Sequence, residues 1–281
     1  MAAIYHSAAG EAALKATYGG FLQHWPVPHE TLRLPTRQGE TFVIASGDPA
    51  APPLVLLHGS GSNATSWMGD IAAWSAAHRV YAIDVIGEPG FSAPSRPPYA
   101  GEAYAEWLDD VLQGLGVEAA TFVGMSLGGW FSLDYAICRP GRVRALVLVC
   151  PAGLGRGKGG FRLKAWLMLA MGEGGRRRAA RDVFAKAGLP QAYVDYMTLV
   201  FTHFRPRPAV PPAFPDAQLS GLTAPVMLVV GGRDDLLDSA ESRDRLARAR
   251  PDARIVFLPE AGHVIHGQTP AMLAFLEEVG A

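Results

Sequence analysis

Cysteine is scarce in this chain of 281 residues, which has only Cys138 and Cys150. The two residues form no CxxC pair, and their spacing matches no zinc site. A disulfide framework is therefore excluded as the basis of the fold, and no metal is expected. Each cysteine is predicted to be a small buried hydrophobic residue.

An excess of charge of one sign is also missing, because the formal net charge is −1 at pH 7. No overall electric field then attracts nucleic acid or an anionic membrane, and neither is expected as a partner. No run approaches the roughly 18 apolar residues that a membrane-spanning helix needs. The first twenty residues lack the basic and apolar regions of a signal peptide, so we expect a cytoplasmic protein.

Hydrophobic residues are plentiful, at 49% against 18% charged residues, as in a globular protein. Residues 31–37 and 40–47 are predicted to form a hairpin with its turn at Gln38–Gly39. Continuous apolar runs typical of buried parallel strands follow at 53–59, 79–85, 119–125, 144–150, 224–232 and 253–262. Helical patterns alternate with them at 102–116, 239–250 and 269–280. The chain is therefore predicted to be an α/β protein with a mostly parallel eight-stranded sheet flanked by helices.

This alternation stops between residues 154 and 223, where a glycine-rich entry leads to helical pieces and a proline-rich exit. An insertion of this length between two core strands is usually functional. We interpret 154–223 as a helical cap over the strand ends, with an additional structural lobe as the alternative. The core is then formed by residues 1–153 and 224–281.

The motif GMSLGG at 124–129 follows a buried strand and precedes a helical segment. The pattern G-x-S-x-G between a strand and a helix is typical of a nucleophile elbow, in which a strained turn presents the serine above the sheet. Gly124 and Gly128 are expected to be small because larger side chains would clash across the turn. Ser126 is therefore the candidate nucleophile, and a tight structural turn is the alternative.

A serine hydroxyl needs a base to accept its proton, and the base needs an acid to orient it. His263 lies in the loop after the last predicted strand and is preferred over His266 as the base. The segment VVGGRDDLLD offers Asp234, Asp235 and Asp238 for the acid. Asp235 is preferred, because adjacent positions on an extended backbone point in opposite directions and Asp234 would then face away.

A tetrahedral intermediate needs hydrogen-bond donors for its oxyanion. The backbone N–H of Leu127, just after the nucleophile, is the first candidate. The loop HGSGSNATSW at 58–67 supplies the second, which we assign to the N–H of Ser60. His58 in this loop is predicted to be structural, since His263 already serves as the base.

These motifs, in this order, resemble those of the α/β-hydrolase superfamily from about Thr31 to the end of the chain. Within it, the chain is similar to small bacterial carboxylesterases with a helical cap, and residues 1–30 resemble their N-terminal helical extension. The resemblance implies Ser126, Asp235 and His263 as the triad, Ser60 and Leu127 as the oxyanion hole, and no cofactor. One departure is GEPG at 87–90, where the family commonly has a tight G-x-G. Its Glu88 is expected to be solvated, although it could line the mouth of the site.

The predicted activity is hydrolysis of a small, largely apolar carboxylic ester through an acyl-enzyme. Thioester hydrolysis, carbon–carbon bond hydrolysis and a perhydrolase side activity remain alternatives with the same triad, and a ligand-binding receptor is the non-enzyme alternative. A monomer or a homodimer is expected. Four aromatic or methionine residues of the loop and cap could line the pocket, or they could simply be part of the hydrophobic core. They are Trp67, Trp166, Met197 and Phe201.

Overall fold

The computed structural model describes residues 4–159, 172, 174–175, 178 and 190–281. These residues form one eight-stranded sheet. Its strands are β1 (His29–Thr36), β2 (Gly39–Ser46), β3 (Pro53–Leu57), β4 (Arg79–Ile83), β5 (Ala120–Met125), β6 (Val143–Val149), β7 (Val226–Gly231) and β8 (Arg254–Leu258). Each strand matches a predicted run, so the predicted α/β architecture is confirmed.

The spatial order of the strands is β1-β2-β4-β3-β5-β6-β7-β8. The hairpin β1–β2 joins the sheet through antiparallel pairing of β2 with β4, and the strands from β4 to β8 pair in parallel. Gly39 at the hairpin turn has a φ of +101°, a conformation that glycine adopts without strain. Because β3 to β8 are parallel, their carboxyl ends all meet at one edge of the sheet.

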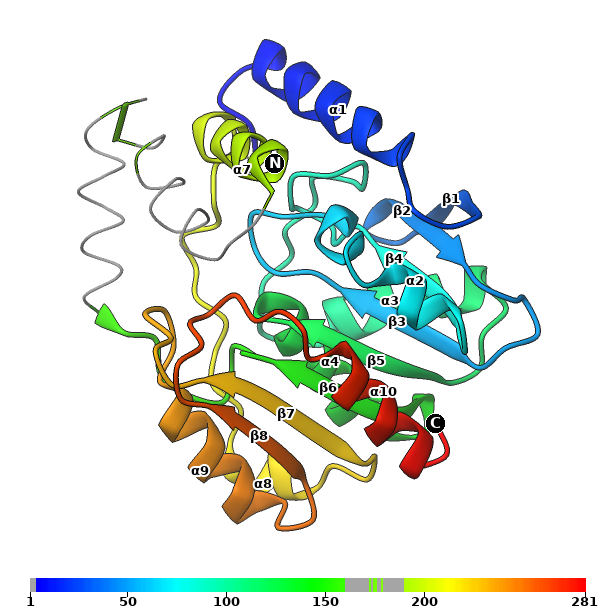
Figure 1. Ribbon diagram of the computed structural model, residues 1–281, viewed down its shortest axis with the longest axis vertical. Coiled ribbons are helices and arrows are strands. Elements are labelled where there is room, and N and C mark those ends of the chain that lie inside the picture. Colours follow the sequence, from blue (N-terminus) through cyan, green and yellow to red (C-terminus); the bar gives the residue numbers. More distant parts are fainter. Residues whose placement is uncertain (1–3, 160–171, 173, 176–177, 179–189) are drawn as a thin grey trace.

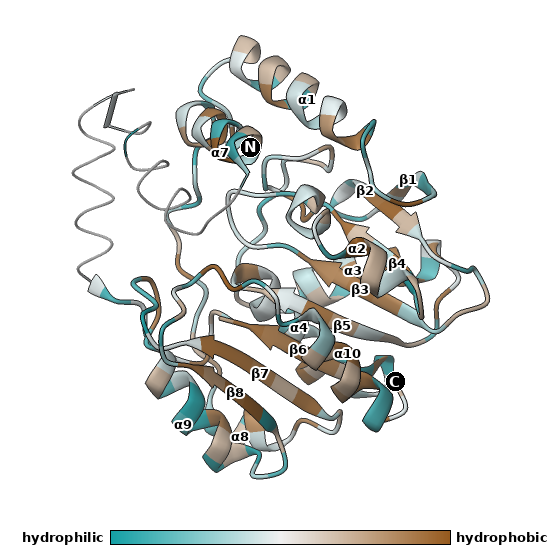
Figure 2. Cartoon of the chain, in the orientation of Figure 1, coloured by the Kyte–Doolittle hydropathy of each residue, from teal (hydrophilic) through white to brown (hydrophobic). Residues whose placement is uncertain are grey.

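Alternate residues of the central strands pack on opposite faces of the sheet. In β5, Phe122 belongs to the hydrophobic core on one face, whereas Val123 belongs to the core on the other. In β6, Leu148 and Val147 divide in the same way. Figure 2 shows that β5, β6 and β7 are mostly hydrophobic in colour. Burial on both faces explains why these strands appear in the sequence as unbroken apolar runs.

Helices cover both faces of the sheet (Figure 1). Residues of α3, α4, α8 and α9 pack in one core, and residues of α1, α2, α7 and α10 pack in the other. Within the described residues, the α-helices are α1 (Ala8–Leu22), α2 (Ile71–Ser75), α3 (Ala103–Gly114), α4 (Leu127–Cys138), α7 (Gln191–His203), α8 (Asp216–Ser220), α9 (Ser239–Ala249) and α10 (Thr269–Glu278). Two short 3-10 helices are η1 (Ala64–Trp67) and η2 (Pro140–Arg142).

Helix α1 lies beside α7, although the two are far apart in the sequence (Figure 1). The chain just before α1 pairs with the end of α7, because the His6 N–H donates to the His203 carbonyl at 2.8 Å and the Arg205 N–H donates to the Ile4 carbonyl at 2.8 Å. The N-terminal segment contains the expected helix, α1, and its backbone is bonded to the end of α7. Helix α7 belongs to the region interpreted as the cap, whose boundaries at 154–223 stay a prediction.

The predicted strand runs extend beyond the observed strands at their carboxyl ends. The run 253–262 is a strand only to Leu258, and the run 224–232 only to Gly231. The residues that follow each strand form loops at the carboxyl edge, where the candidate site lies. Across the described ranges, no helix is both long and apolar enough to cross a membrane.

Candidate active site

The candidate site lies at the carboxyl edge of the parallel strands. Ser126 follows β5, Asp234 follows β7 and His263 follows β8. The sheet thus brings together three polar side chains that are separated by up to 137 positions in the chain. This edge is where open α/β sheets bind their ligands.

Ser126 has a strained backbone, with φ 53° and ψ −110°, directly before helix α4. The glycines around it are required by close packing, as predicted. A Cβ on Gly124 would lie 2.5 Å from the Gly128 carbonyl oxygen, and a Cβ on Gly128 would lie 2.0 Å from that of Leu57. Strain that persists at such a position is often part of a mechanism. Here it places the serine hydroxyl at the N-terminus of α4.

His263 lies within hydrogen-bond distance of Ser126. Its Nε2 accepts from the Ser126 hydroxyl, with 3.0 Å between Nε2 and Oγ. The competing His266 is exposed to solvent. The structure therefore pairs the serine with the preferred histidine.

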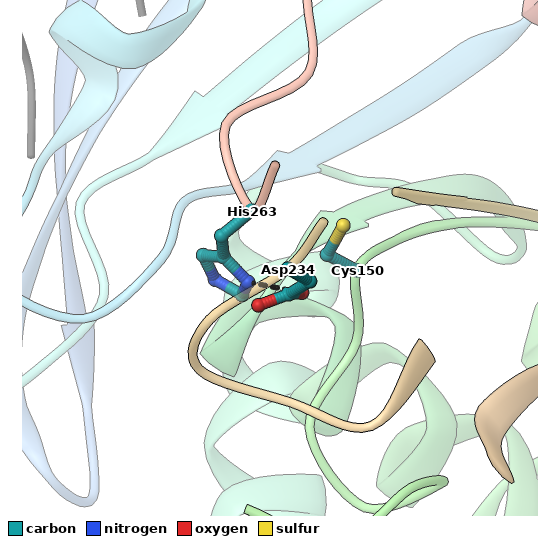
Figure 3. A group of neighbouring side chains, drawn as sticks. All are labelled: Cys150, Asp234 and His263. Atoms are coloured by element: carbon teal, nitrogen blue, oxygen red, sulfur yellow. Dashed lines mark hydrogen bonds and ion pairs between the residues drawn. The ribbon is translucent and has the colours of Figure 1, made fainter. Parts of the chain in front are cut away.

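The carboxylate that contacts His263 belongs to Asp234, and the prediction of Asp235 was wrong. His263 Nδ1 donates to Asp234 Oδ2 at 2.7 Å (Figure 3). Asp235 is exposed, whereas Asp234 is completely buried. The cause is a turn that closes with the Asp234 N–H donating to the Gly231 carbonyl at 3.2 Å. The backbone is no longer extended there, so the alternation of side-chain directions used for the prediction does not apply.

The other oxygen of Asp234 is also engaged. Oδ1 accepts the N–H groups of Leu236 at 2.7 Å and Leu237 at 3.0 Å. Burial acts to raise the pKa of Asp234, but the hydrogen bond and charge of His263 and these two N–H donors outweigh it and hold the pKa below its usual value. Asp234 is thus an ionised, fixed acceptor that orients the imidazole with its proton on Nδ1.

Cys150 lies beside Asp234 (Figure 3). It is buried, as predicted, and it has a φ of 42°. Ligand-type atoms of Cys150, Asp234 and His263 lie within 4.8 Å of one another. Burial raises the pKa of the thiol to about 12, so Cys150 is protonated beside the carboxylate. Asp234 Oδ2 and His263 Nδ1 already share a hydrogen bond with each other.

The two predicted oxyanion donors belong to two separate segments, helix α4 and the loop after β3. Leu127 is the first residue of α4, and an N–H in the first turn has no helical acceptor. Gly59 lies so close to the nucleophile that a Cβ on it would be 3.3 Å from Ser126 Cβ. The next residue, Ser60, therefore belongs to a loop adjacent to the serine, and its N–H stays the predicted second donor.

His58 is structural, as predicted. Its Nε2 accepts the Val85 N–H at 2.9 Å, so the proton resides on Nδ1, which donates to the Gly59 carbonyl at 2.8 Å. Burial lowers the pKa of His58 to about 4, so the ring is neutral. It joins the ends of β3 and β4 beneath the candidate oxyanion loop.

Glu88 is buried, so the expectation of a solvated side chain was wrong. Only 4% of the residue is exposed. Its Oε2 accepts the Gly61 N–H at 2.6 Å and the Ser60 hydroxyl at 3.3 Å. The only signal in the sequence was the departure at GEPG. The Gly61 N–H is engaged by Glu88, which leaves the Ser60 N–H for an oxyanion.

The predicted pocket residues lie close to the hydrophobic core. Trp67 and Met197 are buried in the core that contains α1 and α7, and Phe201 is half-buried against it. Trp166 lies outside the described residues. Contact of Trp67, Met197 and Phe201 with a substrate stays a prediction.

Comparison with known proteins agrees with this geometry. A model described as "Alpha/beta hydrolase family" matches residues 54–274. The chain is 31% identical over 280 residues to the carboxylesterase nap of Bacillus subtilis (strain 168), with 90% of this chain and 87% of the relative covered. It is 30% identical over 272 residues to the carboxylesterase YbfK of that organism, with 94% and 92% covered. The crystal structure of naproxen esterase (carboxylesterase NP) from Bacillus subtilis superimposes with a TM-score of 0.83 at 28% identity, covering 98% of each chain.

Proposed function

The chain belongs to the α/β-hydrolase family, and from this membership we propose that it hydrolyses small, largely apolar carboxylic esters through an acyl-enzyme on Ser126. The observation that carries the proposal is the chain of hydrogen bonds from Ser126 Oγ to His263 Nε2 and from His263 Nδ1 to Asp234 Oδ2. Binding alone does not require a base that is aligned by a buried acid. This argues against a receptor that has lost turnover.

In acylation, Ser126 Oγ attacks the ester carbonyl carbon while its proton passes to His263 Nε2. The tetrahedral intermediate collapses as the bond to the alcohol oxygen breaks, and His263 delivers the proton to the leaving alcohol. Asp234 stays ionised and stabilises the positive imidazolium, consistent with its lowered pKa. The product of this half-reaction is an ester between the acyl group and Ser126.

Deacylation repeats these steps with water. His263 accepts a proton from water, whose oxygen attacks the acyl carbon. His263 then returns a proton to Ser126 Oγ as the bond between Oγ and the acyl carbon breaks and the carboxylic acid leaves. In both halves, the N–H groups of Leu127 and Ser60 donate to the oxyanion, and a single such donor is typically worth a factor of about 100 to 1,000 in rate. No cofactor enters this sequence of steps.

The ester class is supported by the two relatives of about 30% identity, both of which are carboxylesterases. An apolar acyl or alcohol group is supported by the hydrophobic residues of η1 and α7, which share one core, because η1 directly follows the loop that carries Ser60. The cytoplasmic location and the choice between monomer and homodimer stay predictions.

The test is hydrolysis of p-nitrophenyl esters across a series of acyl lengths by the wild type and by Ser126→Ala. We expect turnover in the wild type and a loss of several orders of magnitude in the variant. Matched thioesters and a dienone with a cleavable carbon–carbon bond are measured in parallel. Turnover retained in Ser126→Ala would refute the mechanism, and a clear preference for a thioester or dienone would refute the ester class.

A further inference from the structure

Glu88 lies in the loop after β4, beneath the loop that carries the predicted oxyanion donor. We propose that Glu88 is a positioning residue that holds residues 59–61 so that the Ser60 N–H points toward the oxyanion at Ser126. This inference rests on the proposed ester hydrolysis. It assigns to Glu88 a role in the chemical step without direct contact with the reacting atoms.

The contacts of the carboxylate support this role. Oε2 accepts the Gly61 N–H at the short distance of 2.6 Å and the Ser60 hydroxyl at 3.3 Å. Gly61 has a φ of +69°, which turns its peptide group relative to the preceding one. One carboxylate oxygen therefore holds both residues that flank the Ser60–Gly61 peptide bond. With the Gly61 N–H engaged, the preceding N–H is the one left to donate to a substrate.

The loop lies close enough to the nucleophile for small movements to matter. A Cβ on Gly59 would be 3.3 Å from Ser126 Cβ, so the backbone passes directly beside the serine. A misplacement of about 1 Å in a reacting group can cost about 100-fold in rate. A loop of glycine and serine has little side-chain packing of its own, so an external anchor would define its position.

The segment that carries Glu88 is itself fixed. The Arg96 guanidinium donates through Nε to the Gly87 carbonyl at 2.9 Å and through Nη2 to the Arg205 carbonyl at 2.9 Å. It thus connects the Glu88 loop to the chain that follows α7. The segment that carries Glu88 is thus held by a side chain that also binds the chain after α7.

Burying a carboxyl group at this position costs free energy, which argues that Glu88 has a function there. Burial raises the pKa of Glu88 to about 7, against lowering effects of the Gly61 N–H, Arg96, the Ser60 hydroxyl and Arg207. The charge of Glu88 also acts to raise the pKa of three tyrosines, of which Tyr5 and Tyr104 are buried and Tyr99 is half-buried. An apolar residue would avoid the cost of burying a charge but could not accept the Gly61 N–H.

The experiment compares Glu88→Ala, Glu88→Gln and the control Asp134→Asn. Asp134 is a buried carboxyl group on α4 whose pKa burial likewise raises to about 7, and it has no role in the proposed site. For each protein, kcat and KM are measured with the p-nitrophenyl ester that the wild type hydrolyses fastest. Active sites are counted by fluorophosphonate labelling. A trifluoromethyl ketone of the same acyl length, which forms an oxyanion on the serine, gives a Ki.

In Glu88→Ala we expect kcat per labelled site to fall by about 10- to 100-fold, with the Ki rising by a similar factor and KM within about threefold of wild type. Glu88→Gln keeps an acceptor for the Gly61 N–H but loses the charge, so we expect losses of only about two- to fivefold in both quantities. Asp134→Asn is expected to match the wild type. Should Glu88→Ala not fold, the parallel change of kcat and Ki in Glu88→Gln is the test.

Three results would overturn the proposal: wild-type kcat per site and Ki in the folded Glu88 variants, a loss explained entirely by fewer labelled sites, or an equal loss in Asp134→Asn. Failure of the proposed function is a separate outcome. If the wild type hydrolyses no ester or Ser126 is not labelled, both proposals fall. If turnover depends on Ser126 but not on Glu88, only the positioning role falls.

Discussion

At the scale of single residues, the acid of the proposed triad is selected by a local turn. The sequence offers two adjacent aspartates, and the turn between Gly231 and Asp234 directs the first of them into the interior. Two further N–H donors, from Leu236 and Leu237, then fix its carboxylate. The neighbouring Asp235 is left in solvent, so the pair provides a matched test.

We predict that Asp234→Asn lowers kcat for ester hydrolysis by about 1,000- to 10,000-fold, because the amide favours the wrong imidazole tautomer and cannot stabilise the imidazolium. Asp235→Asn changes the charge by the same amount one residue away and should stay within about twofold of wild type. Steady-state kinetics on the two purified variants checks this. A larger loss in Asp235→Asn than in Asp234→Asn would contradict the assigned triad.

The serine and histidine that lie in hydrogen-bond contact could be predicted from the sequence, and the aspartate that contacts the histidine could not. Ser126 lies within a G-x-S-x-G motif between a strand and a helix, and this motif can be recognised in the sequence. His263 follows the last strand. The acid depended on where β7 ends and how the chain turns, which short apolar runs do not specify. Glu88 was missed because a single acidic residue in a polar loop gives no signal of burial.

At the scale of elements, the close pairing of α1 with α7 connects the N-terminal segment to the region interpreted as the cap. A Cβ on Gly10 of α1 would lie 2.6 Å from Nδ1 and 2.9 Å from Cβ of His203 on α7. Gly20 of the same helix has no such neighbour within 4 Å. Substituting each glycine by alanine therefore distinguishes the effect of helix propensity on stability from the effect of packing against α7.

We predict that Gly10→Ala lowers the free energy of unfolding by about 1 kcal/mol or more, because overpacking outweighs the gain in helix propensity. Gly20→Ala should raise it by up to about 1 kcal/mol, since it gains propensity without a clash. Chemical denaturation of both variants measures the difference. Equal stabilisation by the two substitutions would mean that α1 and α7 are not packed this closely.

The elements of the sheet could be predicted because burial on both faces leaves unbroken apolar runs in the sequence. The contact of α1 with α7 could not, because it joins segments separated by more than 160 positions and depends on small residues such as Gly10 rather than on a motif. Local patterns specify which segments are helices, whereas their partners are set by the fold as a whole.

At the scale of the whole molecule, several carboxyl groups are buried. Burial raises the pKa of Asp84 to about 6 and the pKa values of Glu88 and Asp134 to about 7. For an acid whose pKa is higher in the folded state than in the unfolded state, the stabilising contribution is fully present at pH values below the unfolded pKa. That stabilisation is lost as the pH rises through the folded pKa. These groups therefore make the protein less stable as the pH rises from about 4 to about 7.

Asp134→Asn isolates this effect, because burial is the main cause of its shift and repulsion from Glu102 adds to it. The pKa rises from 3.8 to about 7, and each pKa unit corresponds to about 1.4 kcal/mol, so we expect the variant to be more stable than wild type by up to about 4 kcal/mol at pH 8. Below about pH 3 the advantage should vanish, since the wild-type carboxyl group is then protonated in both the folded and the unfolded state. Melting temperatures of both proteins across this range test the sign. An advantage that grows toward low pH would contradict it.

The central claim is that Ser126 forms a covalent acyl-enzyme, and rapid mixing with a p-nitrophenyl ester tests it most directly. We predict a burst of about one p-nitrophenol per active site if deacylation limits turnover, together with an acyl adduct on the Ser126 peptide after acid quench. Ser126→Ala should give neither the burst nor the adduct. Turnover by the wild type with an acyl adduct on another residue, or undiminished turnover by Ser126→Ala, would contradict the account.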